Sequence, residues 1–203
     1  MKNRIENKFM RTNEFIMLSL IFMTLISCYD SSEQESYDDV VYRMIQEDDV
    51  SSLKKYVAST GYDLTKFTKR VGSFNYFNPI GHVAAENNSA KTVYYLDSLN
   101  YDFSLKGFDG LTILMEYVQS HGGLENVEFF SYLLSKVDIH TQDVDGSNVV
   151  DYILVFDRVH YLNVLIDSDL LSEHEIRKLK EKLLDSEYLP YTKKIRNYLL
   201  KVE

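Results

Sequence analysis

A pattern that recurs every 33 to 36 residues is the feature that most restricts how this chain of 203 residues can fold. Three segments align with Pro79, Thr112 and Asn148 at equivalent positions, which stand 33 and 36 residues apart. The longer interval contains a loop at 121–126 that adds about three residues. An amphipathic stretch with helical spacing follows each segment, at 92–96, 128–134 and 161–166. A period of this length predicts a short array of stacked helical units.

These segments resemble the ankyrin repeat family, whose unit reads roughly D-x-x-G-x-T-P-L-H-x-A-A, then V-x-x-L-L, then G-A-D-x-N. His82 with residues 84–87 (AAEN) is the best local match, and residues 136–146 match the hairpin between repeats. Asp109-Gly110 and Asp145-Gly146 precede the second and third segments. The chain departs from the pattern where Ile113 replaces the proline, Met115 and Asp151 the histidine, and Asn148 the threonine.

The first aligned repeat has two possible registers. Asn78-Pro79 can serve as the T-P pair of the family, which shifts that repeat by one residue. A degenerate unit precedes it, with helices expected at 40–45 and around 53–57 and with Gly61-Tyr62-Asp63 in place of G-A-D. The resemblance therefore implies an all-α fold, namely a solenoid of about four helix–turn–helix repeats over residues 37–166 with hairpin-like connections.

The tail from 167 to 203 breaks the period and is expected to form a C-terminal helical cap, since the last unit of a repeat array must shield its apolar face. Ser172 and Glu175 form a capping-box pattern at the start of one helix, and a last helix is expected from about Pro190 to Val202.

The amino-terminal residues have the pattern of a targeting signal. A basic start is followed by twelve largely apolar residues, Phe15 to Ile26, which is the layout of a secretory signal peptide and is too short for a typical membrane-spanning helix. The sequence Leu25-Ile26-Ser27-Cys28 resembles a bacterial lipobox. That resemblance implies cleavage after residue 27 and lipidation of Cys28, with an ordinary signal peptide and an incidental cysteine as the alternative.

The polar, acidic stretch at 28–36 predicts a flexible tether behind the anchor. We therefore expect a protein that is lipid-anchored in a bacterial cell envelope, facing the periplasm or the exterior. Whether the anchor lies in the inner or the outer membrane is left open.

Composition excludes several classes of function. A formal net charge of −9 disfavours nucleic-acid binding, and a single cysteine excludes a disulfide framework or a cysteine-rich zinc site. The five histidines lack metal-ligand spacing, and His82 is expected to brace the backbone of the neighbouring repeat. Neither a phosphate-binding glycine loop nor a nucleophile motif is present, so we expect no catalytic residue, no metal, no cofactor and no small-molecule substrate.

The aspartates and the tyrosines can each be interpreted as functional or as structural residues. Asp102, Asp109, Asp138 and Asp145 recur at one phase of the repeat, which favours turns that bond local amides over a catalytic pair. Tyrosine is abundant, with 16 residues, and is common at protein interfaces. Tyr95, Tyr132 and Tyr152 are instead expected to replace leucine in the core.

The ankyrin resemblance implies non-catalytic binding of a protein partner, whose identity the sequence does not give, through the concave face and hairpin tips. The alternative is a periplasmic chaperone or an immunity protein that neutralises a toxin or enzyme. Phe108 is expected to expose its ring at a tip or to pack against the neighbouring tip. The binding residues carried over by register are Asn75, Tyr76, Asn78, Glu86, Asn87, Phe108, Asp109, Leu111, Gln119, Ser120, Val144, Asp145 and Ser147.

Overall fold

The computed structural model describes residues 36–71, 76–120, 126–185, 195, 197 and 198. The chain divides into two units, 1–36 and 37–203, and the second is described below. The expected signal peptide, Cys28 and nearly all of the expected tether lie outside the described residues. Within the described ranges, the structure contains no helix of the length and hydropathy that a membrane crossing requires.

The described part of the second unit is mostly helical, as the sequence predicts. The expected helices that fall within the described residues form at the expected places, with ends extended by a few residues. The helices are α2 (Tyr37–Gln46), α3 (Val50–Thr60), α4 (Ile80–Glu86), α5 (Ala90–Ser98), α6 (Ile113–Gln119), α7 (Val127–Leu134), α8 (Val149–Val155), α9 (Val159–Asp167) and α10 (Glu173–Asp185), with the short 3-10 turns η1 (Leu64–Lys66) and η2 (Phe108–Gly110).

A two-stranded antiparallel ribbon departs from the all-α expectation. Strand β1 (Thr68–Val71) pairs with β2 (Tyr76–Pro79), so that Thr68 lies opposite Pro79 and Val71 opposite Tyr76. The β-branched and aromatic residues of these strands suit extended backbone. Pro79 ends β2 and is also the N-cap residue of α4, so the ribbon leads directly into that helix.

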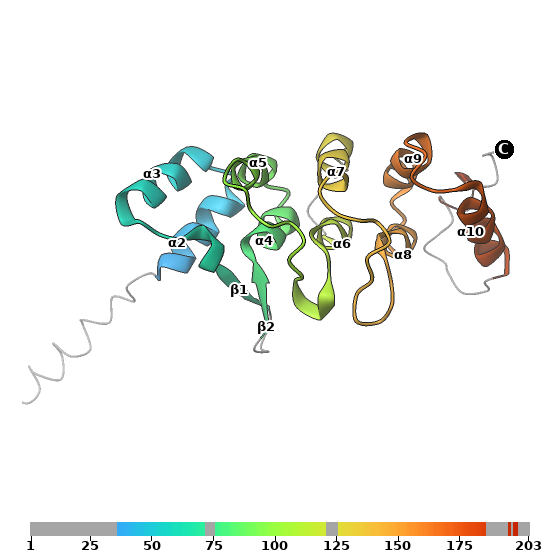
Figure 1. Cartoon of the computed structure of the whole chain (residues 1–203), viewed down its shortest axis with the longest axis horizontal. Coiled ribbons are helices and arrows are strands. Elements are labelled where there is room, and N and C mark those ends of the chain that lie inside the picture. Colours follow the sequence, from blue (N-terminus) through green and yellow to red (C-terminus); the bar gives the residue numbers. More distant parts are fainter. Residues whose placement is uncertain (1–35, 72–75, 121–125, 186–194, 196, 199–203) are drawn as a thin grey trace, which may run out of the picture. The chain divides into compact units, whose positions relative to one another are not determined.

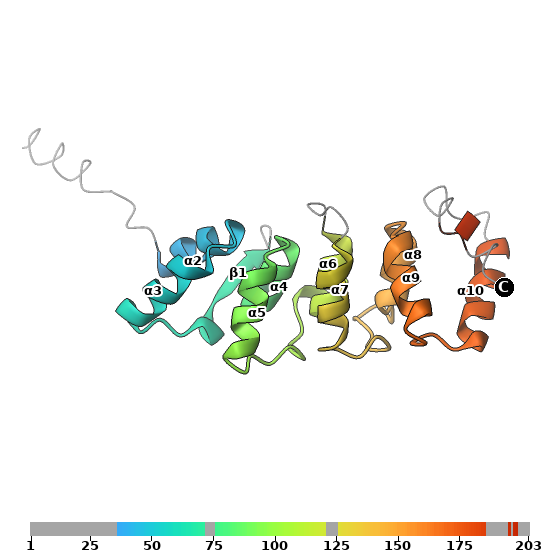
Figure 2. The same ribbon diagram turned by 90° about the horizontal axis from the view of Figure 1, so that it is seen from above.

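Neighbouring helices contact one another in a regular order. Helices α2, α4, α6 and α8 each contact the next in that series, and each packs against the helix that follows it in sequence, namely α3, α5, α7 and α9. Figure 1 shows the two sets as separate rows, and Figure 2 shows the same pairs from above. Side chains join α5 to α7 as well, since the Tyr94 and Tyr132 rings lie 4.5 Å apart, edge to face.

The turn inside three of these helix pairs has the same geometry. Asp48, Asn88 and Asp157 adopt φ values of 49°, 56° and 54°, a left-handed conformation that Asp and Asn tolerate. In each turn the next residue donates its backbone N–H to the carbonyl five positions earlier, over 2.8 to 3.0 Å. Equivalent residues in different pairs thus make equivalent backbone bonds.

The three tyrosines expected in the core are only half-buried. Each ring packs against the core, but the Tyr132 hydroxyl donates to Asp97 Oδ2 at 2.6 Å and the Tyr152 hydroxyl to Asp143 Oδ2 at 2.8 Å. Tyrosine differs here from leucine because a phenol hydroxyl has to keep a hydrogen-bond partner when its ring is covered.

The capping box at the start of α10 is confirmed. The backbone N–H of Glu175 donates to Ser172 Oγ at 3.3 Å, and that of Ser172 donates to Glu175 Oε2 at 2.8 Å. The last expected helix falls mostly outside the described residues, but Ile195 is helical and fully buried. Its backbone N–H donates to Asp157 Oδ1 at 3.3 Å.

Candidate functional site

The loops that enter α6 and α8 are joined near their tips, and the first of these loops is also bonded to the end of strand β2, next to the start of α4. The Val144 backbone N–H donates to the Asp109 carbonyl at 3.0 Å, and Lys106 Nζ donates to the Gln142 carbonyl at 3.3 Å. On the other side, the Phe108 N–H donates to Asn78 Oδ1 at 2.8 Å. The two loops and the end of β2 are therefore held together by backbone as well as side-chain bonds.

His82 has the structural role that the sequence predicts. Its side chain is buried, and Nε2 lies 3.0 Å from the Leu111 carbonyl of the next loop. Because a carbonyl can only accept, Nε2 carries the hydrogen and Nδ1 remains an acceptor, which is buried without a hydrogen-bond partner. Burial lowers the pKa of His82 to about 4, against the opposing effect of the Leu111 hydrogen bond.

Two residues carried over as binding residues are instead buried. Asn78 is 3% exposed and Leu111 is 5% exposed. The Asn78 carboxamide is used within the fold because it holds the N–H of Phe108, and Leu111 is a core residue whose carbonyl holds His82. The expectation that these side chains face a partner is therefore wrong.

The other positions near the ribbon and the first tip give a mixed result. Asn75 lies outside the described residues, and Tyr76 is described only as part of β2. Phe108 is half-buried, so of the two alternatives that the sequence leaves open, a fully exposed ring at the tip is wrong. The Phe108 side chain is therefore partly packed within the fold and partly at the surface.

The remaining predicted residues stay accessible, and we call them the first-helix face. Among them, the apolar side chain of Val144 is 69% exposed. Asn87 and Ser120 also hold helix ends, through bonds to the carbonyls of Val83 and Tyr117. The first-helix face comprises the exposed Glu86, Asp109, Val144 and Asp145 and the half-buried Asn87, Gln119, Ser120 and Ser147.

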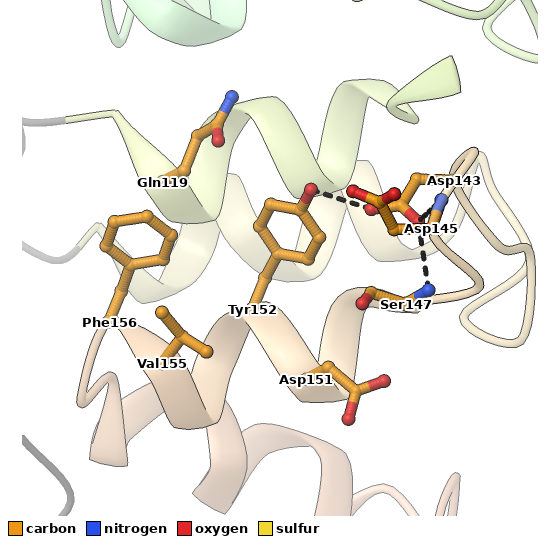
Figure 3. Close-up of a pocket in the computed structure, with 8 residues that line it drawn as sticks. All are labelled: Gln119, Asp143, Asp145, Ser147, Asp151, Tyr152, Val155 and Phe156. Atoms are coloured by element: carbon orange, nitrogen blue, oxygen red, sulfur yellow. Dashed lines mark hydrogen bonds between the residues drawn. The ribbon is translucent and has the colours of Figure 1, made fainter. Parts of the chain in front are cut away.

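A pocket of about 300 Å³ lies on this face between α6 and α8, and we call it the α6–α8 pocket. Gln119 lines it from α6, Asp143, Asp145 and Ser147 from the preceding loop, and Asp151, Tyr152, Val155 and Phe156 from α8 and its end. Figure 3 shows the Tyr152 hydroxyl pointing toward the Asp143 carboxylate, with the Phe156 ring on the far side of Tyr152. The structure thus brings together three of the predicted residues, Gln119, Asp145 and Ser147.

Asp143, which the sequence analysis did not single out, holds this loop in place. Its Oδ1 accepts from the backbone N–H groups of Asp145 and Ser147, each at 2.9 Å, while Oδ2 accepts from Tyr152. Burial acts to raise the pKa of Asp143, but these hydrogen bonds outweigh it and lower the pKa.

The pKa of the Tyr152 hydroxyl is shifted the opposite way. Burial, followed by the hydrogen bond to Asp143 and its charge, raises the pKa of Tyr152, and the charge of Glu116 adds to the shift. A donor with a raised pKa facing an acceptor with a lowered pKa suits a fixed structural bond, because general acid–base catalysis needs pKa values near the working pH.

Glu116 is a further residue that sequence reasoning missed. It lies in the middle of α6, is 6% exposed, and its Oε2 is buried without a hydrogen-bond partner. Burial, with the charge of Glu86 adding to it, raises the pKa of Glu116 to about 7, while Gln119 and Asn78 oppose the shift. The available signal was that Glu116 is the one charged residue in the apolar run 111–118.

The recurring aspartates behave largely as turn residues. Asp102 Oδ1 accepts from the N–H of Ser104, and Asp138 Oδ1 from the N–H of His140, both at 2.9 Å, as predicted. At the other two positions the backbone makes the hydrogen bond instead. The Asp109 carbonyl accepts from the N–H of Val144, and the Asp145 N–H donates to Asp143 Oδ1. Over the described ranges, no three His, Cys, Asp or Glu side chains are grouped in a way that would hold a metal ion.

A comparison with known protein families and a search of curated proteins both find no match to this chain.

Proposed function

We propose that the helix pairs from residue 37 onward are ankyrin-type repeats and that the chain acts as a non-catalytic protein-binding module. The sequence period of 33 to 36 residues supports this proposal. So do the equivalent turns at Asp48, Asn88 and Asp157 and the contacts of each first helix with the next. The fold is then a solenoid, in which each unit is stabilised mainly by its neighbours.

The observation that carries the functional part is the joining of the tips at the Asp109 carbonyl and the Val144 N–H, 3.0 Å apart. This bond makes one continuous surface from residues that belong to different repeats. The loop uses the backbone N–H groups of Val144 and Asp145 for its hydrogen bonds, and both residues remain exposed on this surface. A broad surface built on rigid elements suits the recognition of another protein.

A pair of charge reversals tests this proposal. Asp145→Arg changes the first-helix face, whereas Glu128→Arg makes the same change at an exposed position on α7. Partner recovery is measured by affinity purification of the membrane-extracted protein and mass spectrometry. We expect Asp145→Arg to reduce recovery of the main partner about tenfold, the scale of an interface hot spot, and Glu128→Arg to leave it unchanged.

Equal recovery with both variants would contradict the proposal, provided that both melt like the wild type. A protein that is recovered with the wild type and lost with Glu128→Arg alone would place the binding surface on the second helices instead.

We also propose that Cys28 is lipidated and anchors the protein to a bacterial cell envelope. The support is the sequence alone, because a basic start, an apolar run and Leu25-Ile26-Ser27-Cys28 occur in the order of a lipoprotein signal. Two or three acyl chains hold a protein firmly, whereas one chain does so only marginally.

Cys28→Ala tests the anchor, because it removes the thiol that would carry the lipid. We expect the variant to leave the membrane fraction or to accumulate as an uncleaved precursor, and we expect the wild type to incorporate labelled fatty acid. Normal processing and membrane association of Cys28→Ala, with no label on the wild type, would contradict the proposal.

A further inference from the structure

We propose that two copies of this chain bind each other through the ribbon and the two loops beside it, in an antiparallel pair with two-fold symmetry. This inference goes beyond the proposed function, because it names a second copy of the chain as an occupant of this surface. It follows from charges that change sign along the surface and from apolar side chains that are exposed at both of its ends.

Three neighbouring segments carry different charges. The ribbon with the turn before it (64–79, the ribbon segment) contains three basic residues and no acidic one. The middle tip (104–111) contains one residue of each sign, and the acidic loop (138–148) contains three aspartates and neither lysine nor arginine. In chain order, the charged residues are Lys66, Lys69, Arg70, Lys106, Asp109, Asp138, Asp143 and Asp145.

The middle tip separates the two oppositely charged segments within one chain. The Phe108 N–H of the middle tip is bonded to Asn78 Oδ1 of the ribbon at 2.8 Å, and its Asp109 carbonyl to the Val144 N–H of the acidic loop at 3.0 Å. Figure 1 shows the ribbon and the two loops on the same side of the helices, in chain order. Because these bonds fix that order, the ribbon segment meets an acidic loop only when a second chain supplies it.

The opposite charges are accessible to a second chain. The Lys66 side chain is 81% exposed, and its ion pair with Asp63 at 3.6 Å is a surface pair, which contributes little. Lys69 is held more firmly, with Nζ 3.8 Å from the centre of the Tyr42 ring, and is half-buried. On the acidic loop, Asp145 is exposed. Lys66 and Asp145 are therefore the two charges that are best placed to pair between copies.

Each outer segment also exposes an apolar side chain. Phe77 of β2 is 50% exposed, and Val144 of the acidic loop is exposed to a still greater extent. Burial of these side chains against another chain is favourable, and an aromatic ring contributes a large contact area. Charge complementarity fixes orientation and partner choice more than it adds affinity, so the two kinds of group have separate roles.

The order of the charges selects one arrangement of the two copies. In a parallel pair, like charges would face each other, which is unfavourable. In an antiparallel pair, each ribbon segment faces the acidic loop of the other copy, and the two middle tips, each with Lys106 and Asp109, meet at the two-fold axis. Both outer contacts are then equivalent, so the contact closes as a dimer and does not extend into a filament.

A charge exchange tests this proposal on the detergent-purified full chain. The variants are Lys66→Glu, Asp145→Lys and the double variant that carries both changes. Lys55→Glu on α3 and Glu128→Lys on α7 are controls that make the same changes at exposed positions outside the three segments. Sedimentation equilibrium in a density-matched detergent measures the mass of the protein complex over a concentration series.

We expect the wild type to pass from monomer to dimer with concentration, and to do so less readily at about 1 M salt, where the Debye length is about 3 Å. Lys66→Glu and Asp145→Lys should each weaken the dimer about tenfold, because each change acts at both symmetry-related contacts. The double variant should return to within about threefold of the wild type, and both controls should match the wild type.

A wild type that stays monomeric throughout the series would overturn the proposal. So would a double variant that associates more weakly than either single variant, or single variants that associate like the wild type. Complexes that grow beyond a dimer with concentration would exclude the two-fold pair.

These outcomes are distinguishable from a failure of the proposed function, because self-association is measured without any other protein. If the charge exchange restores the dimer while Asp145→Arg leaves partner recovery unchanged, the proposed function fails and the dimer stands. If the wild type stays monomeric while Asp145→Arg reduces partner recovery, the reverse holds.

Discussion

Two buried side chains, His82 and Glu116, respond to pH in opposite directions. The pKa of His82 falls from 6.5 to about 4 in the folded chain, mainly through burial, so acid favours the unfolded chain between those values. The pKa of Glu116 rises from 4.5 to about 7, again mainly through burial, so the folded chain holds that proton more tightly. The contribution of Glu116 to the free energy of unfolding is therefore fully present below pH 4.5 and is lost as the pH rises to about 7.

These effects largely cancel between pH 4.5 and 6.5, where both groups are in their transition range. We predict that Glu116→Gln removes the stability that the wild type gains from Glu116 on acidification, so that its free energy of unfolding, relative to the wild type, falls by up to about 1.4 kcal/mol per pH unit as the pH is lowered. Urea denaturation at pH 4.5, 5.5 and 6.5 measures this.

His82→Gln provides the reciprocal measurement, because it leaves Glu116 as the uncompensated group. Relative to the wild type, this variant should lose stability as the pH rises from 4.5 to 6.5, whatever its absolute stability. Stability curves of both variants that run parallel to the wild-type curve would show that neither group titrates as its surroundings indicate.

The sequence predicts the role of His82 but not that of Glu116, for a physical reason. His82 stands in a motif whose neighbours, such as Ala84 and Ala85, are themselves informative. Burial of Glu116 depends on side chains from α4 and α8, which lie dozens of residues away in sequence. The same reason explains why the burial of Asn78 and Leu111 was not predicted. Aligning a residue with a position of the repeat pattern gives its place along the backbone, but it does not show which side chains pack over it.

At the scale of single elements, the tips of neighbouring loops depend on left-handed glycines. Gly110 and Gly146 have φ values of 77° and 81°, so an alanine at either position is strained to a similar degree. Their surroundings differ. A Cβ on Gly110 would lie 3.3 Å from both Cγ1 and the backbone nitrogen of Val144, whereas a Cβ on Gly146 would meet no atom within 4 Å.

We predict that Gly146→Ala destabilises the protein by about 1 kcal/mol through backbone strain alone. Gly110→Ala should cost about 1 kcal/mol more, because the new methyl group presses on Val144 and disturbs its bond to Asp109. Thermal denaturation of both variants measures the difference.

A double variant locates the cause. Val144→Ala removes Cγ1, so Gly110→Ala should cost less in that background, whereas Gly146→Ala should cost the same. If the two glycine variants are equally destabilised in both backgrounds, the tips do not press on each other as described.

Helix positions were predictable from sequence because each amphipathic stretch repeats at one period and is bounded by polar turns. The ribbon β1–β2 was not, because residues 64–77 have no counterpart in the other units and carry no helical period. Their β-branched and aromatic content, with a glycine at 72, was the available signal for a hairpin.

At the scale of the whole molecule, hydrogen bonds between neighbouring helix pairs fix the residues around the α6–α8 pocket. Arg158 of the α8–α9 turn donates to the carbonyls of Val118 and Ser120 at the end of α6, over 3.2 and 3.1 Å. These two bonds satisfy carbonyls that have no hydrogen-bond partner within the helix, and they fix α6 against the next helix pair. Gln119 and the α6–α8 pocket are thus placed by two neighbouring helix pairs, so the recognition that we propose would depend on both pairs.

The most direct test of this account is site-specific photocrosslinking in cells that make the protein. A photoreactive amino acid replaces Gln119 or Val155 at the α6–α8 pocket, or Ser131 at an exposed position on α7. We predict that both pocket positions crosslink to the same partner protein and that position 131 does not. A crosslink from position 131 alone, or different partners from positions 119 and 155, would contradict a single binding surface on the first-helix face.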